Sequence, residues 1–295
     1  MEKSLRNARI SIAVVIPTRN REVLLNQILD DLSSQSVKPN IVVVVDSSDE
    51  VLNINRQNLN FVVLSSVIRS AAIQRNLGLA YLDSLDSDFD LCAFLDDDVR
   101  IEEDYLEKLS RTLIDTHGAI GISGLAIGDD ESHIRRNRFL DSIGFTGAEG
   151  KLTCGAINVP VRTAKKVTKV DWLIGCSLWK LDSLGAIRFQ EDFMGQSIFE
   201  DVLFSVEAGK FGNLIVDPQV RFRHLLATEN RPNLFEHYYS WVKNRYRLKR
   251  IAPQNFSTVK FLLVNFLVAG KLFIHLRIKG VLGITLALLQ IGLKR

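Results

Sequence analysis

Four short runs of apolar residues, most of them β-branched, constrain the fold of this chain more than any other feature of its sequence. They lie at residues 10–16, 41–45, 61–64 and 91–95. The runs are apolar at nearly every position, which is typical of parallel strands that are covered on both faces. Helical periodicity occurs between and after them, in residues 22–34, 71–85 and 102–116. This alternation predicts an α/β fold with a doubly wound, mostly parallel sheet and helices on both faces.

The second half of the chain is less regular. We expect strands at 118–127 and near 170–174, a helix from about Phe199, and short strands at 214–216 and 220–222. Residues 128–155 are rich in Gly, Arg and Asp, and they predict a long loop. Long loops in compact domains usually serve a function.

Composition excludes several classes of protein. Hydrophobic residues make up 46% of the 295 residues and charged residues 24%, which excludes a disordered chain. The cysteines, Cys92, Cys154 and Cys176, form no CxxC pair, so neither a disulfide framework nor a zinc knuckle is expected. The N-terminal residues MEKSLRNARI are too polar for a signal peptide, and we expect a cytoplasmic protein.

Charge is distributed unevenly along the chain. The net charge is +3, but residues 237–295 hold eleven Lys and Arg and no Asp or Glu, leaving 26 basic and 34 acidic residues before them. We therefore divide the chain into a body, residues 1–232, and a basic, apolar helical tail, residues 233–295.

The tail has helical periodicity over 235–251 and 256–276, and 280–293 is an uncharged apolar stretch of 14 residues. A helix that spans a bilayer needs about 20 such residues. Basic residues beside Leu, Phe and Ile suit a helix that lies on an anionic membrane surface. A helix pair packed on the body fits the same pattern.

Polar residues follow each of the first four apolar runs. They are Pro17-Thr18-Arg19-Asn20, Asp46-Ser47-Ser48, Ser65-Ser66 and Asp96-Asp97-Asp98. In an open parallel sheet, ligands bind in the crevice at the carboxyl ends of the strands. The four clusters are therefore expected along one edge of the sheet.

The three consecutive aspartates resemble a DxD motif. In an extended chain, Asp96 and Asp98 point to one side and Asp97 to the other. Two carboxylates held close together repel unless a cation neutralises them, and their oxygens suit Mg²⁺ or Mn²⁺ bound also to phosphates. The alternative is a solvated acidic turn before the next helix.

The chain contains neither GxGxxG nor GxxxxGK[ST], which argues against a dinucleotide fold and a P-loop. It does contain VVIPTRNR at 14–21, VVVVDSS at 42–48, IQRNLGL at 73–79, FLDDDV at 94–99 and FEDVLFSVEAGKFG at 199–212. In this order and spacing, the five motifs resemble a family 2 glycosyltransferase of the GT-A fold, of the inverting, rhamnosyltransferase-like type that builds polysaccharides. The resemblance covers about the first 225 residues.

The resemblance implies roles for individual residues. The donor nucleotide sugar would contact Pro17, Thr18, Arg19, Asn20, Asp46, Arg75, Asn76, Asp96 and Asp97. Among these, Asp46 would bind the base and Asp96 the ribose. Asp98 would hold a metal ion that bridges the two phosphates, with His224 near it. Taken singly, Arg19 and Arg75 also fit ordinary surface arginines, and His224 a structural histidine.

The resemblance also implies a general base, Asp201 of the Glu200-Asp201 pair, which would take the proton of the acceptor hydroxyl. Adjacent helical residues point about 100° apart, so only one of the two faces the cleft, and the sequence does not decide which. Trp172, Gly175 and Trp179 would shape the acceptor pocket. Core tryptophans are the alternative.

Two departures from the family pattern limit the expected function. Gln74 stands where a small residue is usual, which weakens the expected nucleotide contact there. No QxxRW motif occurs and the tail lacks several spanning helices, so a processive polysaccharide synthase is not expected. The resemblance implies a metal-dependent transferase with its catalytic domain in 1–232, and together with the basic tail it suggests a glycan or lipid-linked acceptor. No nucleic-acid partner is expected. The tail would contact the cytoplasmic face of the membrane. A nucleotidyltransferase and a noncatalytic scaffold of the same fold are the alternatives.

Overall fold

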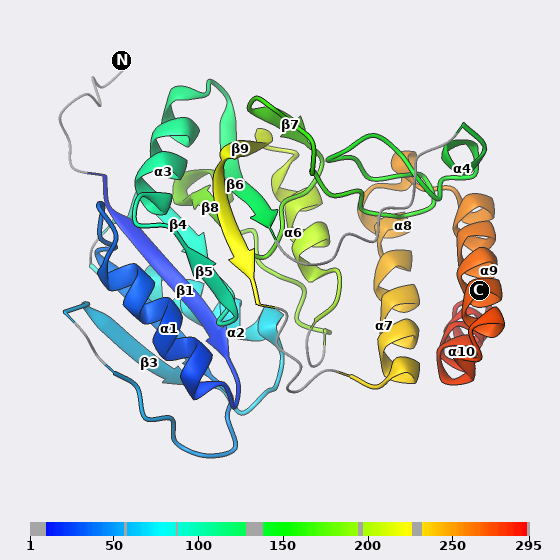
Figure 1. The fold of residues 1–295 in the computed structure, drawn as a ribbon, viewed down its shortest axis with the longest axis horizontal. Helices are drawn as coiled ribbons and strands as arrows, with labels where there is room; N and C mark the ends of the chain where they lie inside the picture. The colour runs from blue at the N-terminus through cyan, green and yellow to red at the C-terminus, as the bar shows by residue number, and fades with distance from the viewer. Residues whose placement is uncertain are drawn as a thin grey trace.

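The computed structural model describes residues 10–55, 58–86, 88–127, 138–193, 197–225 and 232–293. The N-terminal segment 1–9 and residues 128–137 of the expected loop lie outside these ranges. The strands are β1 (Ile12–Thr18), β2 (Ile41–Asp46), β3 (Phe61–Ser65), β4 (Leu91–Phe94), β5 (Val99–Ile101), β6 (Ala119–Ile127), β7 (Thr168–Val170), β8 (Ser177–Lys180) and β9 (Asn213–His224). They form one sheet in the order β3-β2-β1-β4-β8-β6-β9-β5, with β7 also paired to β9 (Figure 1).

The chain has helices on both faces of this sheet and, in the tail, beside it (Figure 1). They are α1 (Glu22–Ser33), α2 (Ala71–Asp83), α3 (Tyr105–Asp115), α4 (Arg138–Ser142), α5 (Leu181–Leu184), α6 (Glu200–Ala208), α7 (Leu234–Tyr246), α8 (Leu248–Ile251), α9 (Thr258–Ile274) and α10 (Ile278–Leu293), with a 3-10 turn at Pro253–Asn255. Apolar residues of α1 and α3 share a core with one face of β1, and residues of α2 and α6 share a core with the other.

The β3-β2-β1-β4 half of the sheet is parallel, as the apolar runs predict. Every residue of β1 is buried, which explains why its sequence does not alternate. Helix α2 lies close to β1, because a Cβ at Gly78 would overlap the side chain of Val15. This close packing brings the start of α2 to the carboxyl end of the sheet.

The other half of the sheet is mixed. Strand β8 lies between β4 and β6 and is antiparallel to both, and β5 and β7 are antiparallel to β9. The sequence did not predict β5 or β8. The strand expected at 170–174 begins earlier, as β7, and the two strands expected at 214–216 and 220–222 are the single strand β9.

Strand β9 contains an irregularity in its pairing with β6. Asp217 pairs with Gly124 and Arg221 with Leu125, so residues 218–220 are additional on β9. Extra residues of this kind bend a strand. Beyond the bulge β9 pairs with β5, where His224 lies opposite Val99, directly after the three aspartates.

The tail forms part of the same core as the body. Helix α7 carries an N-terminal capping box at Asn233 and Glu236. Buried apolar residues of α7, α9 and α10, among them Val242, Phe261 and Ile284, belong to the core that contains α6. Among the described residues, no helix is long and apolar enough to cross a membrane.

A buried arginine fastens the tail to residues 138–156. Arg245 of α7 donates to the carbonyl oxygens of Ala156 at 2.7 Å and Gly155 at 2.6 Å, and to Oδ1 of Asn265 at 3.1 Å. Its guanidinium lies 3.7 Å from the ring centre of Trp241. These contacts satisfy a cation that would otherwise be costly to bury.

Candidate active site

A cavity of about 590 Å³ lies at the carboxyl ends of the parallel strands. Its walls come from the ends of β1 and β4, from α2 and α6, from residues 174–176, and from the start of α7. The place agrees with the expectation from sequence, because the polar clusters after β1 and β4 meet there.

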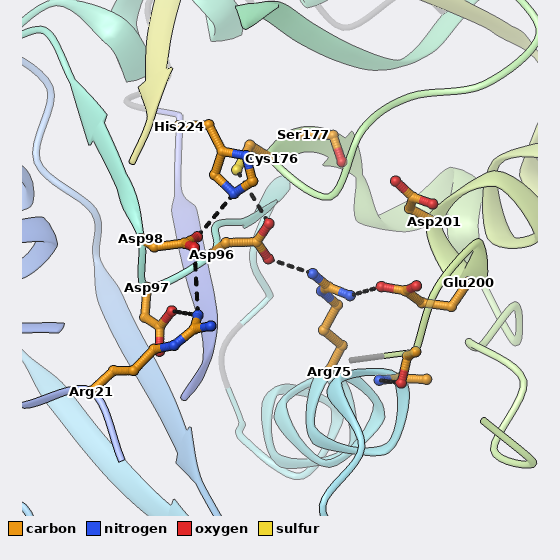
Figure 2. A network of polar contacts seen from close by, with 12 residues as sticks. Arg21, Arg75, Asp96, Asp97, Asp98, Cys176, Ser177, Glu200, Asp201 and His224 are labelled. Carbon is orange, nitrogen blue, oxygen red and sulfur yellow. Dashed lines mark hydrogen bonds and ion pairs between the residues drawn. The ribbon is translucent and has the colours of Figure 1, made fainter. Parts of the chain in front are cut away.

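Three side chains on one wall of this cavity are arranged as metal ligands. Asp96, Asp98 and His224 each offer one ligand atom, and these atoms lie within 4.8 Å of one another. Nε2 of His224 is 3.0 Å from Oδ1 of Asp98 (Figure 2). Two carboxylates and an imidazole fit Mn²⁺ well, whereas Mg²⁺ prefers oxygen ligands alone.

Asp97 faces away from this group, as the alternation along an extended chain predicts. Its carboxylate accepts a hydrogen bond from Oγ1 of Thr18 at 2.8 Å and another from Nη1 of Arg21 at 2.8 Å. Arg21 also lies 3.5 Å from Oδ2 of Asp98. The sequence analysis quoted Arg21 within its first motif but gave it no role. In the structure Arg21 is a cation that contacts both Asp97 and Asp98.

Arg75 connects the aspartate wall of the cavity to the opposite wall. Its side chain is 2% exposed, and it donates to Oδ1 of Asp96 at 2.6 Å and to Oε1 of Glu200 at 2.5 Å (Figure 2). These interactions explain why a buried guanidinium is tolerated at this position. Arg75 is therefore not an ordinary surface arginine.

The Glu200-Asp201 pair begins helix α6, and the two carboxylates have different surroundings. Glu200 is paired with Arg75, whereas Oδ1 of Asp201 accepts from its neighbour Val202 N at 2.7 Å. Both residues line the cavity. Burial raises the pKa of Asp201 above its ordinary value, while Arg75 opposes the rise. Burial also raises the pKa of Glu200.

The backbone that leads into α6 is held by its neighbours. Phe199 has a φ of 78° and Ser197 a φ of 52°. Residues other than glycine rarely adopt such positive φ angles. Oγ of Ser197 lies 3.1 Å from Oγ of Ser70, and Nδ2 of Asn244 donates to the carbonyl of Ile198 at 2.9 Å. Contacts from α2 and α7 thus fix the direction of the Glu200-Asp201 pair.

The remaining expected donor residues divide into two groups. Pro17, Thr18 and Arg19 line the cavity. Asp46 does not, because its Oδ1 accepts from Ser48 N at 2.8 Å. Asn20 lies at the surface, where its Nδ2 donates to Asp49 at 2.8 Å.

Asn76 also lies away from the cavity wall. Its Nδ2 donates to the carbonyl oxygen of Phe189 at 2.8 Å, and its Oδ1 accepts from Phe189 N at 2.8 Å. The side chain thus holds the chain near Phe189 against α2.

Of the three expected acceptor residues, only Gly175 lines the cavity. Trp179 is 1% exposed, packs against Phe204 with ring centres 5.1 Å apart, and donates from Nε1 to Oγ of Ser177 at 2.8 Å. Trp172 is also buried in the core. Trp179 on β8 and Trp172 in the loop between β7 and β8 therefore follow the core alternative.

Several cavity residues were not singled out from sequence for this role. Cys176 lies with its Sγ 3.9 Å from Oδ2 of Asp96, and His237 and Tyr238 come from α7. No short motif marks these positions, because they reach the cavity through β8 and the tail.

Three proteins of known structure are among those that share the fold. S. aureus TarS 1–349 has 16% identity and a TM-score of 0.50, covering 97% of this chain and 92% of that one. Mannosyltransferase PcManGT from Pyrobaculum calidifontis has 14% identity and a TM-score of 0.53, covering 97% and 76%. GalNAc-T7 has 15% identity and a TM-score of 0.52, covering 78% and 47%. Of another, longer S. aureus TarS structure, this chain covers 42%. No curated protein sequence matches the chain.

A family model decides what kind of protein this is. The model for glycosyl transferase family 2 matches residues 13–165, more than half of the chain. The chain belongs to glycosyl transferase family 2 and has the GT-A fold. This confirms the resemblance read from the motifs and removes the nucleotidyltransferase alternative. The rhamnosyltransferase-like assignment gains no support from these matches.

Proposed function

We propose that the protein is an inverting glycosyltransferase that moves a hexosyl group from a nucleoside-diphosphate sugar to an acceptor hydroxyl, with a divalent cation. The observation that carries this proposal is that the Asp96, Asp98 and His224 group and the Asp201 carboxylate line the same cavity. PcManGT in complex with GDP-Man and Mn²⁺, and GalNAc-T7 with UDP, GalNAc and Mn²⁺, share the fold and support it.

The donor would lie along the wall formed by the ends of β1 and β4. Pro17, Thr18 and Arg19 would contact the nucleoside, and Asp46, which precedes the cavity residue Ser47, would receive the base. Asp96, Asp98 and His224 would hold Mn²⁺ or Mg²⁺. The bound cation would neutralise the charge that gathers on the diphosphate as the sugar bond breaks.

Asp201 would act as the general base. Glu200 is already neutralised by Arg75, which leaves Asp201 as the carboxylate to take the proton from the acceptor hydroxyl. The hydroxyl oxygen forms a bond to the anomeric carbon as the bond to the nucleoside diphosphate breaks, and the proton passes to Asp201. Attack from the face opposite the leaving group inverts the anomeric centre.

The acceptor would be a glycan or a lipid-linked glycan used in cell-surface polysaccharide synthesis. Gly175 is the expected acceptor residue that lines the cavity, and a Cβ there would come within 3.1 Å of Asp96 Oδ2. The tail would bring the protein to the cytoplasmic face of a membrane, where such an acceptor is held. Its basic residues and exposed apolar side chains support this partner.

A thermal-shift screen tests the donor site. UDP, GDP and dTDP are each added with and without Mn²⁺, and one of them is expected to raise the melting temperature only when Mn²⁺ is present. Saturation at about 100 times the dissociation constant adds about 2.7 kcal/mol of stability. The Asp98→Asn variant should lose the Mn²⁺-dependent part of the shift. Absence of any shift in folded protein would favour the noncatalytic scaffold.

A further inference from the structure

Helix α9 has apolar side chains both on its buried side and on the side that faces solvent. Leu262, Leu263, Phe266, Phe273 and Ile274 are all exposed, and Phe266 is 75% exposed. Successive helical residues are turned by about 100°, so the spacing of these five positions places them on one face. A helix that only packs on a protein body exposes its polar face instead.

Helix α10 also has apolar residues on both sides. Three of its four buried residues are small, Gly280, Gly283 and Ala287, and a Cβ at Gly283 would overlap the carbonyl oxygen of Phe235 on α7. The large residues, Leu282, Leu286, Leu289 and Leu293, are exposed. Helices α9 and α10 lie at one edge of the molecule, outside α7 (Figure 1). We call the exposed apolar residues of α9 and α10 the apolar face.

The charged residues of α9, of α10 and of the turn between them are all positive. Residues 237–295 contain no Asp or Glu, and Lys271, Arg277 and Lys279 are exposed where α9 and α10 meet. A second copy of this chain would bring the same cations against one another. An anionic lipid surface would pair with them, at about 1 kcal/mol for each Lys or Arg near the surface, a factor of about five in binding.

The lengths of the two helices decide how they meet a bilayer. Helix α9 has 17 residues and α10 has 16, and neither can cross. Contiguous exposed apolar area on a soluble protein marks an interaction surface. Apolar helices that are too short to span, with basic residues beside them, lie within the plane of the interface.

The apolar face is connected to the active-site cavity through α7. Tyr238 of α7 lines the cavity, and a Cβ at Gly280 of α10 would come within 2.9 Å of the Tyr238 ring. A single residue of α7 therefore lies between the cavity and helix α10, which carries part of the apolar face.

We propose that the apolar face of α9 and α10 docks the protein on an anionic lipid bilayer, with both helices lying in the interface. In this position the start of α7 faces the lipid headgroups, and a lipid-linked acceptor reaches the cavity past Tyr238. The part about the acceptor rests on the proposed glycosyltransferase function, whereas the docking does not.

Vesicle sedimentation of the full chain without any nucleotide tests the docking. The protein is expected to sediment with vesicles of phosphatidylcholine mixed with phosphatidylserine, and more weakly with phosphatidylcholine alone. The F266S/F273S variant should bind the vesicles at least about tenfold more weakly than the parent protein, because two exposed rings no longer enter the bilayer. K271Q/K279Q should weaken binding about 25-fold on the anionic vesicles and little on the neutral ones.

Matched variants on the body distinguish a loss of docking from an unspecific effect of removing an exposed ring or two lysines. Phe211 is 68% exposed on the turn after α6, so F211S removes a similar ring from another surface. K165Q/K166Q removes two exposed lysines from the body. Both variants should bind vesicles as the parent protein does.

Three results would overturn the docking proposal. They are no sedimentation with either vesicle, equal losses in F211S and F266S/F273S, and a dimer in analytical ultracentrifugation that F266S/F273S dissociates. Binding to vesicles by a protein that shows no nucleotide-dependent thermal shift would instead reject the glycosyltransferase function and leave the docking intact.

Discussion

The two neighbouring carboxylates at the start of α6 differ in what surrounds them. Glu200 is paired with a buried arginine, and Asp201 contacts only backbone amides in the described hydrogen bonds. The pairing with Arg75 gives Glu200 a structural role, and its replacement would leave Arg75 with one carboxyl partner fewer. Asp201 is the carboxylate that we propose as the general base.

Replacing Asp201 by Asn is expected to lower kcat by about 10²- to 10⁴-fold, because the variant lacks a group that accepts the acceptor proton. The thermal shift with nucleotide and Mn²⁺ should persist, since Asp201 lies on the wall opposite the metal ligands. Steady-state kinetics and the thermal-shift assay measure the two effects. Full turnover in D201N would reject Asp201 as the base.

The raised pKa of Asp201 predicts how activity and stability depend on pH. The base must be ionised to accept a proton. We therefore expect kcat/KM to fall as the pH falls through the pKa of Asp201, which lies above the value of about 3.9 for a free Asp. Burial favours the protonated form, so the ionised group destabilises the fold. D201N should therefore melt at a higher temperature than the parent at neutral pH, and the difference should vanish at low pH. A pH profile of kcat/KM without such a limb would contradict this.

At the scale of elements, the structure depends on close helix contacts that small residues permit. Gly283 of α10 lies against the backbone of α7, where a Cβ would overlap the carbonyl oxygen of Phe235. Gly270 of α9 has nothing within 4 Å of the position that its Cβ would take. The two glycines therefore have opposite expected responses to the same substitution.

Gly283→Ala should lower the free energy of unfolding by about 1 to 3 kcal/mol, because α10 must move away from α7. Gly270→Ala should raise it by about 1 kcal/mol, because Ala favours a helix and meets no neighbour. Urea unfolding measures both. Equal effects of the two substitutions would show that α10 does not pack on α7 as described.

The elements that the sequence predicted are those with a long pattern of one kind. The apolar run at 41–45 and the helical pattern at 71–85 became β2 and α2. Strands β5 and β8 were missed because three or four residues are too few to show a period, and partners distant in sequence define them. The strands expected at 214–216 and 220–222 are one strand, β9. Pro218 lies between the two expected segments, and the bulge of β9 accommodates it.

Candidate site residues could be placed from sequence where a strand end positions them. Asp96 and Asp98 gathered with His224 as expected. The tryptophans could not be assigned this way, because their direction depends on the antiparallel strand β8 and its neighbours. Arg21 and Tyr238 were missed for a related reason, since each reaches the cavity through packing of whole elements.

At the scale of the molecule, the division into residues 1–232 and 233–295 does not separate two cores. Apolar side chains of the tail belong to the core that contains α6, and α7 contributes to the cavity wall. We therefore expect the tail to fold together with the catalytic body.

Urea unfolding of the full chain should show a single transition, with coincident midpoints by far-UV circular dichroism and by tryptophan fluorescence. A fragment of residues 1–232 should unfold at a lower urea concentration or fail to fold, because its core would be open on the α7 side. Two separate transitions in the full chain would contradict the shared core.

The bulge in β9 links the chemistry of the site to the length of one strand. Side chains alternate along a strand, and Val220 and Phe222 point inward on the same side as His224, with Arg223 exposed between them. If a relative had one residue more at 218–220, Arg223 would take the place of His224 beside the aspartates. A fixed positive charge would then stand where the imidazole does. The proposed metal site would thus be lost in evolution by a single insertion that leaves every acidic residue in place.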